Sequence, residues 1–277
     1  MKIKTGFLIS FFVLLSLVLV PGYAFAQLEK PTYHVGDYWD YKISASMPSA
    51  DTPLLFTGTA HLEIMEKTKL IVDINNYDVW KVISRFELNS DSYNMTLTEY
   101  TTSYWRISDG ATVKAITDEE ISSIFGSEVS HTETTHRVIQ PDLAFPVDVG
   151  DSWERHEQNK VEDEKGADIE MIDTYYECVD ATDVTTEAGS YPCYVIKSME
   201  DVTVSGTYDM RYHSNNVGNI VKTISYEDGM QTMIMTLESY SYSGVKEDGG
   251  TPGFEFIPLI LSVIGILFIT RKKRNIS

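Results

Sequence analysis

Two cysteines, six histidines and many carboxylates are the side chains of this chain that could do chemistry. Cys178 and Cys193 are the only cysteines among 277 residues. An even cysteine count favours a disulfide in an exported chain, and the N-terminal residues indicate export. Closing a loop of 193 − 178 = 15 residues would stabilise the fold by roughly 3 kcal/mol in the chain-entropy model. We therefore predict a structural disulfide, and not a redox pair, because Cys-x-x-Cys spacing is missing.

The histidines and the acidic residues form no metal-binding motif. No His-Glu-x-x-His motif occurs, and no cysteine spacing suggests zinc. The run Glu162–Glu164 lacks the spacing and the glycine of a calcium loop, so we interpret Glu157 to Asp168 as a charged loop, with calcium binding as the alternative. We expect solvated surface histidines at His34, His61, His131, His136, His156 and His213.

Motifs of catalysis are missing as well. The chain has no Gly-x-Ser-x-Gly elbow and no phosphate-cradling loop. A carboxylate pair of the glycosidase type stays open as an alternative, because 41 − 1 = 40 acidic residues allow many pairs. We expect no catalytic residue, no metal and no cofactor, and therefore no enzyme. Asn94-Met-Thr96 is a sequon that could carry a glycan outside the cell.

The charge of the chain limits its partners. The net charge is −19, and the two apolar ends hold six basic residues and one acidic residue. The body from Gln27 to Thr251 therefore has 22 − 6 = 16 basic and 40 acidic side chains, or −24. A body this acidic repels phosphate backbones, so we expect no nucleic acid as a partner.

The N-terminal residues 1–26 have the layout of a secretory signal peptide. Lys2 and Lys4 precede an apolar run from Gly6 to Val20, and Ala24-Phe25-Ala26 supplies small residues at the cleavage positions. We predict cleavage between Ala26 and Gln27. The alternative is an uncleaved anchor, but a run of 15 residues is short for a membrane span.

The C-terminal residues 252–277 predict a membrane anchor. From Phe254 to Thr270 the chain is apolar over 17 residues, about 25 Å as a helix, which is the lower limit of a span. The basic cluster from Arg271 to Arg274 would stay in the cytoplasm, as would Lys2 and Lys4. Residues 245–251 are polar and rich in glycine, so they predict a short spacer that keeps the body close to the membrane.

Pro252-Gly253-Phe254, the apolar helix and the basic end together resemble the PGF-CTERM sorting signal of archaeal surface proteins. The resemblance covers residues 251–274 only. It implies that an archaeosortase removes the tail and that the new end is joined to a membrane lipid. The alternative is an ordinary single-pass anchor. Both place the body on the outer side of the cytoplasmic membrane, anchored at its C-terminus.

The body contains two similar stretches at one spacing. Val35-Gly36-Asp37-x-Trp39 returns as Val149-Gly150-Asp151-x-Trp153, an offset of 150 − 36 = 114. Tyr77–Ser84 and Tyr191–Ser198 repeat at the same offset, 191 − 77 = 114. Two matches at one offset favour a duplicated module, with copies over residues 27–145 and 146–244 and about six strands in each.

Alternation of apolar and polar residues predicts antiparallel strands with one buried face. Asp109-Gly110 and Asp228-Gly229 are typical of hairpin turns. One short helix is predicted between the copies, from Thr117 as its cap to Gly126 as its stop. The predicted fold is mainly β: a tandem-duplicated antiparallel meander that forms a curved sheet, a half-barrel or two lobes.

Residues 188–242 also resemble a β-rich module found in uncharacterised exported proteins of bacteria and archaea. The similar residues are Ala188-Gly189-Ser-Tyr191, Cys193-Tyr194-Val195, and the hairpin from Tyr212 to Lys222. This resemblance implies a β fold and no particular chemistry.

The leading hypothesis is a non-enzymatic, membrane-anchored cell-surface protein whose β body binds a surface protein or a glycan. The first alternative is a carrier or sensor of a lipid or other apolar ligand. The ligand would lie against aromatic-rich strands and against the strand that carries Met233, Met235 and Leu237 on one face. The second alternative is an extracellular hydrolase that uses carboxylates. The membrane itself, through the helix or an attached lipid, is the other expected partner.

Overall fold

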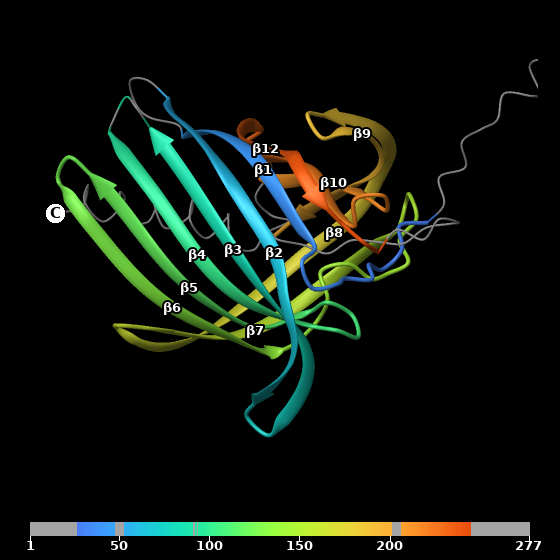
Figure 1. The fold of residues 1–277 in the computed structure, drawn as a ribbon, viewed down its shortest axis with the longest axis horizontal. Helices are drawn as coiled ribbons and strands as arrows, with labels where there is room; N and C mark the ends of the chain where they lie inside the picture. Colours follow the sequence, from blue (N-terminus) through green and yellow to red (C-terminus); the bar gives the residue numbers. More distant parts are fainter. Residues whose placement is uncertain (1–26, 48–52, 91, 93, 201–205, 245–277) are drawn as a thin grey trace, which may run out of the picture.

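The protein is a closed barrel of twelve antiparallel strands (Figure 1). The structure, a computed structural model, describes residues 27–47, 53–90, 92, 94–200 and 206–244. Within these ranges there is no α-helix. The strands are β1 (Tyr38–Met47), β2 (Leu54–Val72), β3 (Asn75–Ser90), β4 (Met95–Arg106), β5 (Thr112–Ser123), β6 (Gly126–Val138), β7 (Ser152–Asp163), β8 (Gly166–Thr186), β9 (Gly189–Met199), β10 (Tyr208–Ser214), β11 (Asn219–Glu227) and β12 (Met230–Ser241).

Each strand pairs with the strand before it, and β12 returns to pair with β1. The prediction of a mainly β, antiparallel fold is confirmed. The predicted half-barrel, open curved sheet or pair of lobes is wrong, because β1 and β12 pair along Tyr38–Ala45 and leave no open edge. Closure removes the unpaired strand edges that an open meander would expose. Among the described residues, none form a helix long and apolar enough to cross a membrane.

The up-and-down order gives the barrel two different ends. Residues 27–37 and 242–244 enter and leave at one end, here called the base. Rings close the base: the centroid of Tyr33 lies 5.6 Å from that of Trp39 and 5.9 Å from that of Trp105. Beside them, Leu28 pairs with Val147 over the buried side chain of Leu143. The hairpins β5–β6, β7–β8 and β11–β12 turn at the opposite end, here called the mouth.

The predicted helix from Thr117 to Gly126 is wrong. These residues lie in β5 and in the turn to β6, and Thr117 pairs with Thr101 of β4. The local capping pattern favours a helix, but pairing of β5 with both β4 and β6 stabilises a strand instead. The predicted charged loop from Glu157 to Asp168 is also wrong, because these residues form the tip of the β7–β8 hairpin.

Two turns at the base have the same geometry, one before β1 and one before β7. Gly36 N donates to Ile64 O over 2.8 Å, and Gly150 N donates to Cys178 O over 2.8 Å. Both glycines have positive φ, +89° and +98°. In each turn the aspartate that follows accepts a bond from the amide three residues earlier, at 2.7 Å from His34 and 2.8 Å from Asp148.

The strands that follow these turns carry matching irregularities. The register shifts between Ile64 and Glu66 in β2, and between Cys178 and Asp180 in β8, which is 178 − 64 = 114 residues later. A second shift lies between Tyr104 and Trp105 in β4 and between Tyr212 and His213 in β10. Bulges bend and twist a strand locally, so matching bulges bend the two halves of the wall alike.

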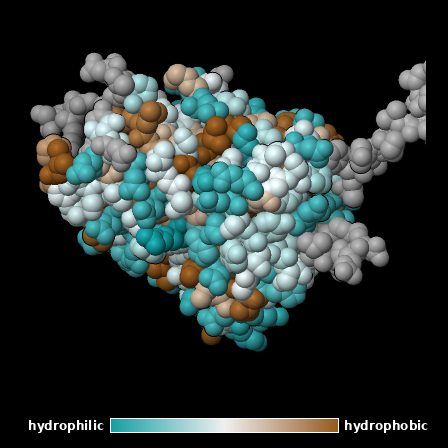
Figure 2. Space-filling model, turned by 45° about the horizontal axis from the view of Figure 1, so that its top comes forward, coloured by the Kyte–Doolittle hydropathy of each residue, from teal (hydrophilic) through white to brown (hydrophobic). Residues whose placement is uncertain are grey.

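The outer wall faces solvent and is charged. Ion pairs cross neighbouring strands there, among them Lys42 with Glu238 (3.0 Å) and Lys114 with Glu133 (2.7 Å). Figure 2 shows apolar side chains on the viewed face as separate small patches among polar ones. Among the described residues, the most exposed large apolar side chains lie at hairpin tips, namely Ile74 at the β2–β3 turn and Phe125 at the β5–β6 turn. The main core therefore lies inside the barrel.

Candidate ligand-binding site inside the barrel

One part of the inner wall is apolar. Strands β12, β1, β2 and β3 turn every second residue inward, and these side chains are buried. The period of two in the sequence produces this face, because successive side chains of a strand point to opposite sides. The wall consists of Trp39, Tyr41, Ile43, Ala45, Phe56, Ala60, Leu62, Ile64, Val82, Phe86, Leu88, Met233, Met235 and Leu237.

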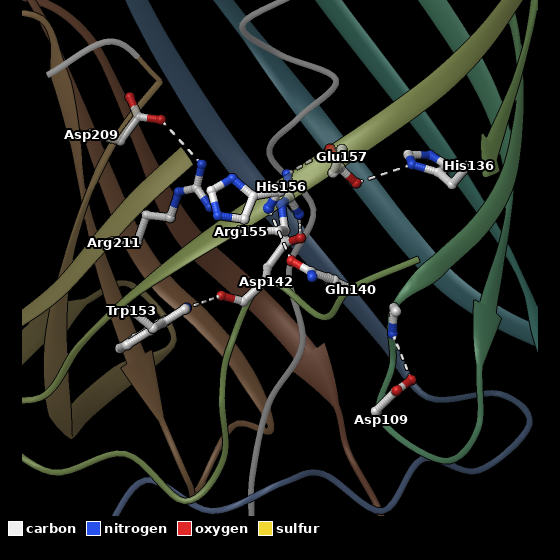
Figure 3. Close-up of polar contacts among 11 residues, drawn as sticks. Asp109, His136, Gln140, Asp142, Trp153, Arg155, His156, Glu157, Asp209 and Arg211 are labelled. Atoms are coloured by element: carbon white, nitrogen blue, oxygen red, sulfur yellow. Dashed lines mark hydrogen bonds and ion pairs between the residues drawn. The ribbon is translucent and has the colours of Figure 1, made fainter. Parts of the chain in front are cut away.

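The other part of the inner wall carries buried charged and polar side chains beside apolar ones such as Ala115 and Ile196, and Arg155 of β7 lies in its polar cluster (Figure 3). Its guanidinium forms an ion pair with Asp142 and another with Glu157 at 3.0 Å. His136 of β6 bonds the other oxygen of Glu157 through Nδ1 at 3.1 Å. The Arg155 guanidinium also lies 5.9 Å from the ring centroid of Tyr176. All these groups are largely buried, so the pairing is what makes their charges tolerable there.

The charges of this cluster determine the state of Glu157. Burial alone would raise its pKa, but the hydrogen bond from His136 and the charge of Arg155 together lower the pKa below its usual value. Glu157 is therefore an ionised carboxylate held by Arg155, His136 and the amide of Asn159. A second buried pair lies on β10, where Arg211 Nη2 is 3.3 Å from Asp209 Oδ2 (Figure 3).

Several buried polar atoms of the polar wall have no hydrogen-bond partner among the described residues. They are Arg155 Nε and Asn159 Oδ1 on β7, and Thr223 Oγ1 and Ser225 Oγ on β11. Thr223 pairs with Met235 and Ser225 with Met233, so these hydroxyls lie where the polar wall meets the apolar wall. Each unsatisfied buried group costs about 1–3 kcal/mol. The interior thus holds hydrogen-bonding capacity that the described chain does not use.

A pair of carboxylates, Glu99 of β4 and Glu119 of β5, lies directly opposite in the strand register. Burial, and secondly the charge of Glu119, raises the pKa of Glu99 to about 8. Burial also raises the pKa of Glu119. A carboxylate hydrolase needs two pKa values pushed apart, one group charged and one protonated. Here burial moves both pKa values upward, which suits protonated groups that donate hydrogen bonds.

Solvent reaches part of the polar wall from the mouth. Thr132 and Thr134 of β6 and Val161 of β7 face inward by register, yet they are only half-buried. Further along, both faces of the β7–β8 hairpin are exposed from Gly166 to Met171. The inner wall is therefore open to solvent on the side of β6–β8 and closed by rings at the base.

No family model matches this chain, and no curated protein is significantly similar to it. One solved structure aligns with it, a crystal structure described as a "putative lipoprotein" from Parabacteroides distasonis ATCC 8503. The alignment covers 78% of this chain and 99% of that chain, with 15% sequence identity and a TM-score of 0.33. A TM-score this low carries no argument about the function of the barrel.

The predicted disulfide is not formed, since Cys178 and Cys193 are both free and buried. Cys178 pairs with Ile196, whereas Cys193 pairs with Thr182. A register shift lies between these pairs, and the two sulfurs belong to different apolar clusters. Burial raises the pKa of each thiol to about 12, so neither is a ready nucleophile.

Of the remaining predicted sites, some lie in the described ranges and others lie outside them. Gln27 and Asn94 are exposed, Asn94 in the turn between β3 and β4. Ala26, the Pro252-Gly253-Phe254 motif and the spacer at 245–251 lie outside the described residues. The prediction of surface histidines is wrong for His136 and His213, which are buried in the wall. Both face inward on strands whose inner residues are largely polar. In the sequence, such a strand has the same composition as one that faces solvent.

A pocket of about 280 Å³ lies on the outer wall over β1, β2, β3 and β12. In it His61 Nδ1 lies 2.7 Å from Asp40 Oδ1, and Ser239 donates to the other oxygen of Asp40 at 2.7 Å. The serine bonds the carboxylate and not the imidazole. A nucleophilic serine needs its base within hydrogen-bond reach, so this arrangement does not resemble an activated triad.

Proposed function

We propose that this protein is a non-enzymatic binding protein of the cell surface whose barrel holds a small amphipathic ligand. The observation that carries the proposal is the division of the inner wall. An apolar arc on β12 and β1–β3 faces a polar arc whose buried atoms Arg155 Nε, Asn159 Oδ1 and Thr223 Oγ1 have no partner among the described residues. Ligand sites usually combine an apolar lining with a few convergent polar groups. Barrels with more than about eight strands also have interior width to spare.

This proposal unites two of the readings drawn from the sequence. A purely external interaction domain would not need a polar arc inside its core. A carrier of wholly apolar molecules would not need one either, because buried polar groups without partners cost free energy. A ligand with an apolar part and a polar part fits both arcs at once.

The test is native mass spectrometry of the full chain, extracted from membranes under mild conditions, followed by titration with the apolar fluorophore 1-aminoanthracene. We expect a bound small molecule, or a fluorescence increase that saturates at one equivalent. Two variants of β1 make a matched pair: Ala45→Leu adds volume to the buried inner face, and Ser44→Leu adds it to the exposed outer face. Ala45→Leu should weaken binding and Ser44→Leu should not. No saturable binding by the folded protein would overturn the proposal.

We propose further that the protein is exported and tethered by its C-terminus, with the tail removed as in PGF-CTERM proteins. The resemblance of residues 251–274 supports this, together with the signal-like N-terminus. The described chain leaves the barrel at the base, and a spacer of seven residues spans at most about 25 Å. The base would then face the membrane and the mouth would face away from it. Mass spectrometry of the mature C-terminus tests the cleavage, and an intact Ser277 would refute it.

We also propose that the barrel arose by tandem duplication of a six-strand unit. The matching turns at Gly36 and Gly150 support this, as do the bulges at Ile64 and Cys178. Both pairs keep the offset of 114 residues that the two sequence matches have.

A further inference from the structure

The polar atoms that lack partners inside the barrel differ in what they need. Arg155 Nε is a donor and needs an acceptor, whereas Asn159 Oδ1 is an acceptor and needs a donor. The Asn159 amide also bonds Glu157, which fixes the direction of its carbonyl oxygen. Thr223 Oγ1 and Ser225 Oγ can each donate and accept. A ligand that satisfies this set must therefore supply both donors and acceptors at several points.

The charges on the inner wall disfavour an anionic ligand. Both inward-facing guanidiniums already hold carboxylates, Arg155 those of Asp142 and Glu157, and Arg211 that of Asp209. No inward-facing cation among the described ion pairs is left over for a ligand carboxylate or phosphate. A carboxylate head would also offer acceptors only and would leave Asn159 Oδ1 unsatisfied.

A cationic head is disfavoured for the opposite reason. An ammonium group has donors and no acceptor, so it cannot bond Arg155 Nε, and it would lie beside a guanidinium of like charge. A hydroxyl group both donates and accepts. A head with several hydroxyls therefore matches the mixture of unpartnered donors and acceptors that β7 and β11 carry.

We propose that the ligand is an uncharged amphiphile whose head carries several hydroxyl groups, as a sugar does, with its alkyl part on the apolar arc. Asn159, Arg155 Nε, Thr223 and Ser225 bind the head. Met233 and Met235, which pair with Ser225 and Thr223, begin the surface for the alkyl part. Inner hydroxyls of β4 and β5, such as the bonded pair Thr101 and Thr117 at 2.9 Å, extend the same polar surface. This inference rests on the proposed function and names the class of its ligand.

Three probes with one tail test the proposal: decyl glucoside, decanoate and decylammonium, each below its critical micelle concentration. They are titrated against the full chain in lipid nanodiscs, with empty nanodiscs as the blank, and binding is followed by tryptophan fluorescence. We expect decyl glucoside to bind at least tenfold more tightly than either charged probe. Tighter binding of decanoate or decylammonium would overturn the inference and leave the binding function standing. Binding of none of the three, together with no uptake of 1-aminoanthracene, would instead count against the proposed function.

A pair of variants separates recognition of the head from folding. Thr223→Val removes an unpartnered inner hydroxyl at nearly constant shape, and Thr236→Val makes the same change on the outer face of β12. Thr223→Val should weaken decyl glucoside about five- to tenfold and leave 1-aminoanthracene unchanged, which corresponds to one lost hydrogen bond. Thr236→Val should change neither. Equal loss of both ligands in Thr223→Val, or loss of neither, would contradict the assignment of Thr223 to the head group.

Discussion

The two halves of the barrel, β1–β6 and β7–β12, share a framework and differ in what they turn inward. The turns at Gly36 and Gly150 make the same hydrogen bonds, and the bulges that follow lie 114 residues apart. At the same offset the inner residues are unlike: Tyr41 and Arg155, Ile43 and Glu157, Ala45 and Asn159, and Ala60 and Thr174. All eight of these side chains are buried.

This difference shows which features set the wall and which are free to vary. A barrel wall is specified by its backbone pairing, its bulges and the alternation of inward and outward residues. Inward positions need only be filled and, if polar, bonded. At the matched positions, β1 satisfies this with aromatic and aliphatic side chains, and β7 with Arg155, Glu157 and their partners. A wall with two unlike arcs follows, and no strand needs a different path.

The largest expected effect comes from removing the positive charge of Arg155 from the polar cluster. Arg155→Met leaves Asp142 and Glu157 buried without their cation, and a broken buried pair costs about 3–5 kcal/mol. Urea unfolding followed by circular dichroism measures the loss. The triple variant Arg155→Met, Asp142→Asn, Glu157→Gln should recover at least half of it. A loss below about 1 kcal/mol for the single variant would mean that the polar half does not depend on its ion pairs.

A pH titration should separate two acidic groups that the barrel treats in opposite ways. The folded pKa of Glu99, about 8, lies above its unfolded value near 4.5, so the folded state binds the extra proton between these values. Its contribution to stability is full below pH 4.5 and is lost as pH rises towards 8, by roughly 1 kcal/mol per pH unit. Glu157 has a lowered pKa, so its contribution is present above pH 4.5 and is lost as pH falls.

The measurement is the unfolding free energy of the wild type and of Glu99→Gln at intervals from pH 5 to 8. The variant should decline less steeply with pH than the wild type over this range, because its amide does not titrate while Glu119, whose pKa is also raised, still does. Parallel curves for the two proteins would show that Glu99 is ionised in the folded state and would remove the contrast with Glu157.

Substitution of the two turn glycines tests whether the halves share a framework. Gly36→Ala and Gly150→Ala each place a Cβ on a residue with φ near +90°, and nothing lies within 4 Å of either new atom. The cost is therefore the backbone conformation alone, about 1–2 kcal/mol in each case. Thermal unfolding should show equal losses within about 0.5 kcal/mol. A difference above about 1 kcal/mol would mean that the matching hydrogen bonds conceal unlike surroundings.

Sequence patterns predicted the antiparallel strand order of the barrel better than they predicted which polar residues face its interior. Alternation and hairpin turns such as Asp228-Gly229 indicated an antiparallel meander, and the structure has one. Closure between β1 and β12 could not be foreseen, because no local signal specifies which edges meet. The helix predicted from Thr117 fits local capping rules, yet pairing of β5 on both sides outweighed them.

The polar arc escaped prediction for a related reason. Glu157 and His136 alternate with other polar residues, so their strands read as charged loop or solvated surface. Their burial depends on Arg155 and on Asp142, which comes from the segment between β6 and β7. The even cysteine count in an exported chain predicts a bridge between Cys178 and Cys193, whereas the strand register pairs Cys178 with Ile196 and Cys193 with Thr182. The ion-pair partners of these residues come from other strands or segments of the chain, so no fixed spacing in the sequence marks them as partners.

The smallest expected effect comes from the position in β1 that matches Arg155. Tyr41 is buried, and its hydroxyl donates to Ile220 O over 3.1 Å. Tyr41→Phe removes this one neutral hydrogen bond and keeps the ring, so it should cost about 1 kcal/mol in urea unfolding. The loss of unfolding free energy should therefore be about three to five times larger for Arg155→Met than for Tyr41→Phe. This ratio measures how much more stability depends on position 155 than on the matching position 41. Equal losses would show that the matched positions on β1 and β7 contribute equally to stability. The buried ion pairs would then serve only to fill the interior, as the apolar side chains of β1 do.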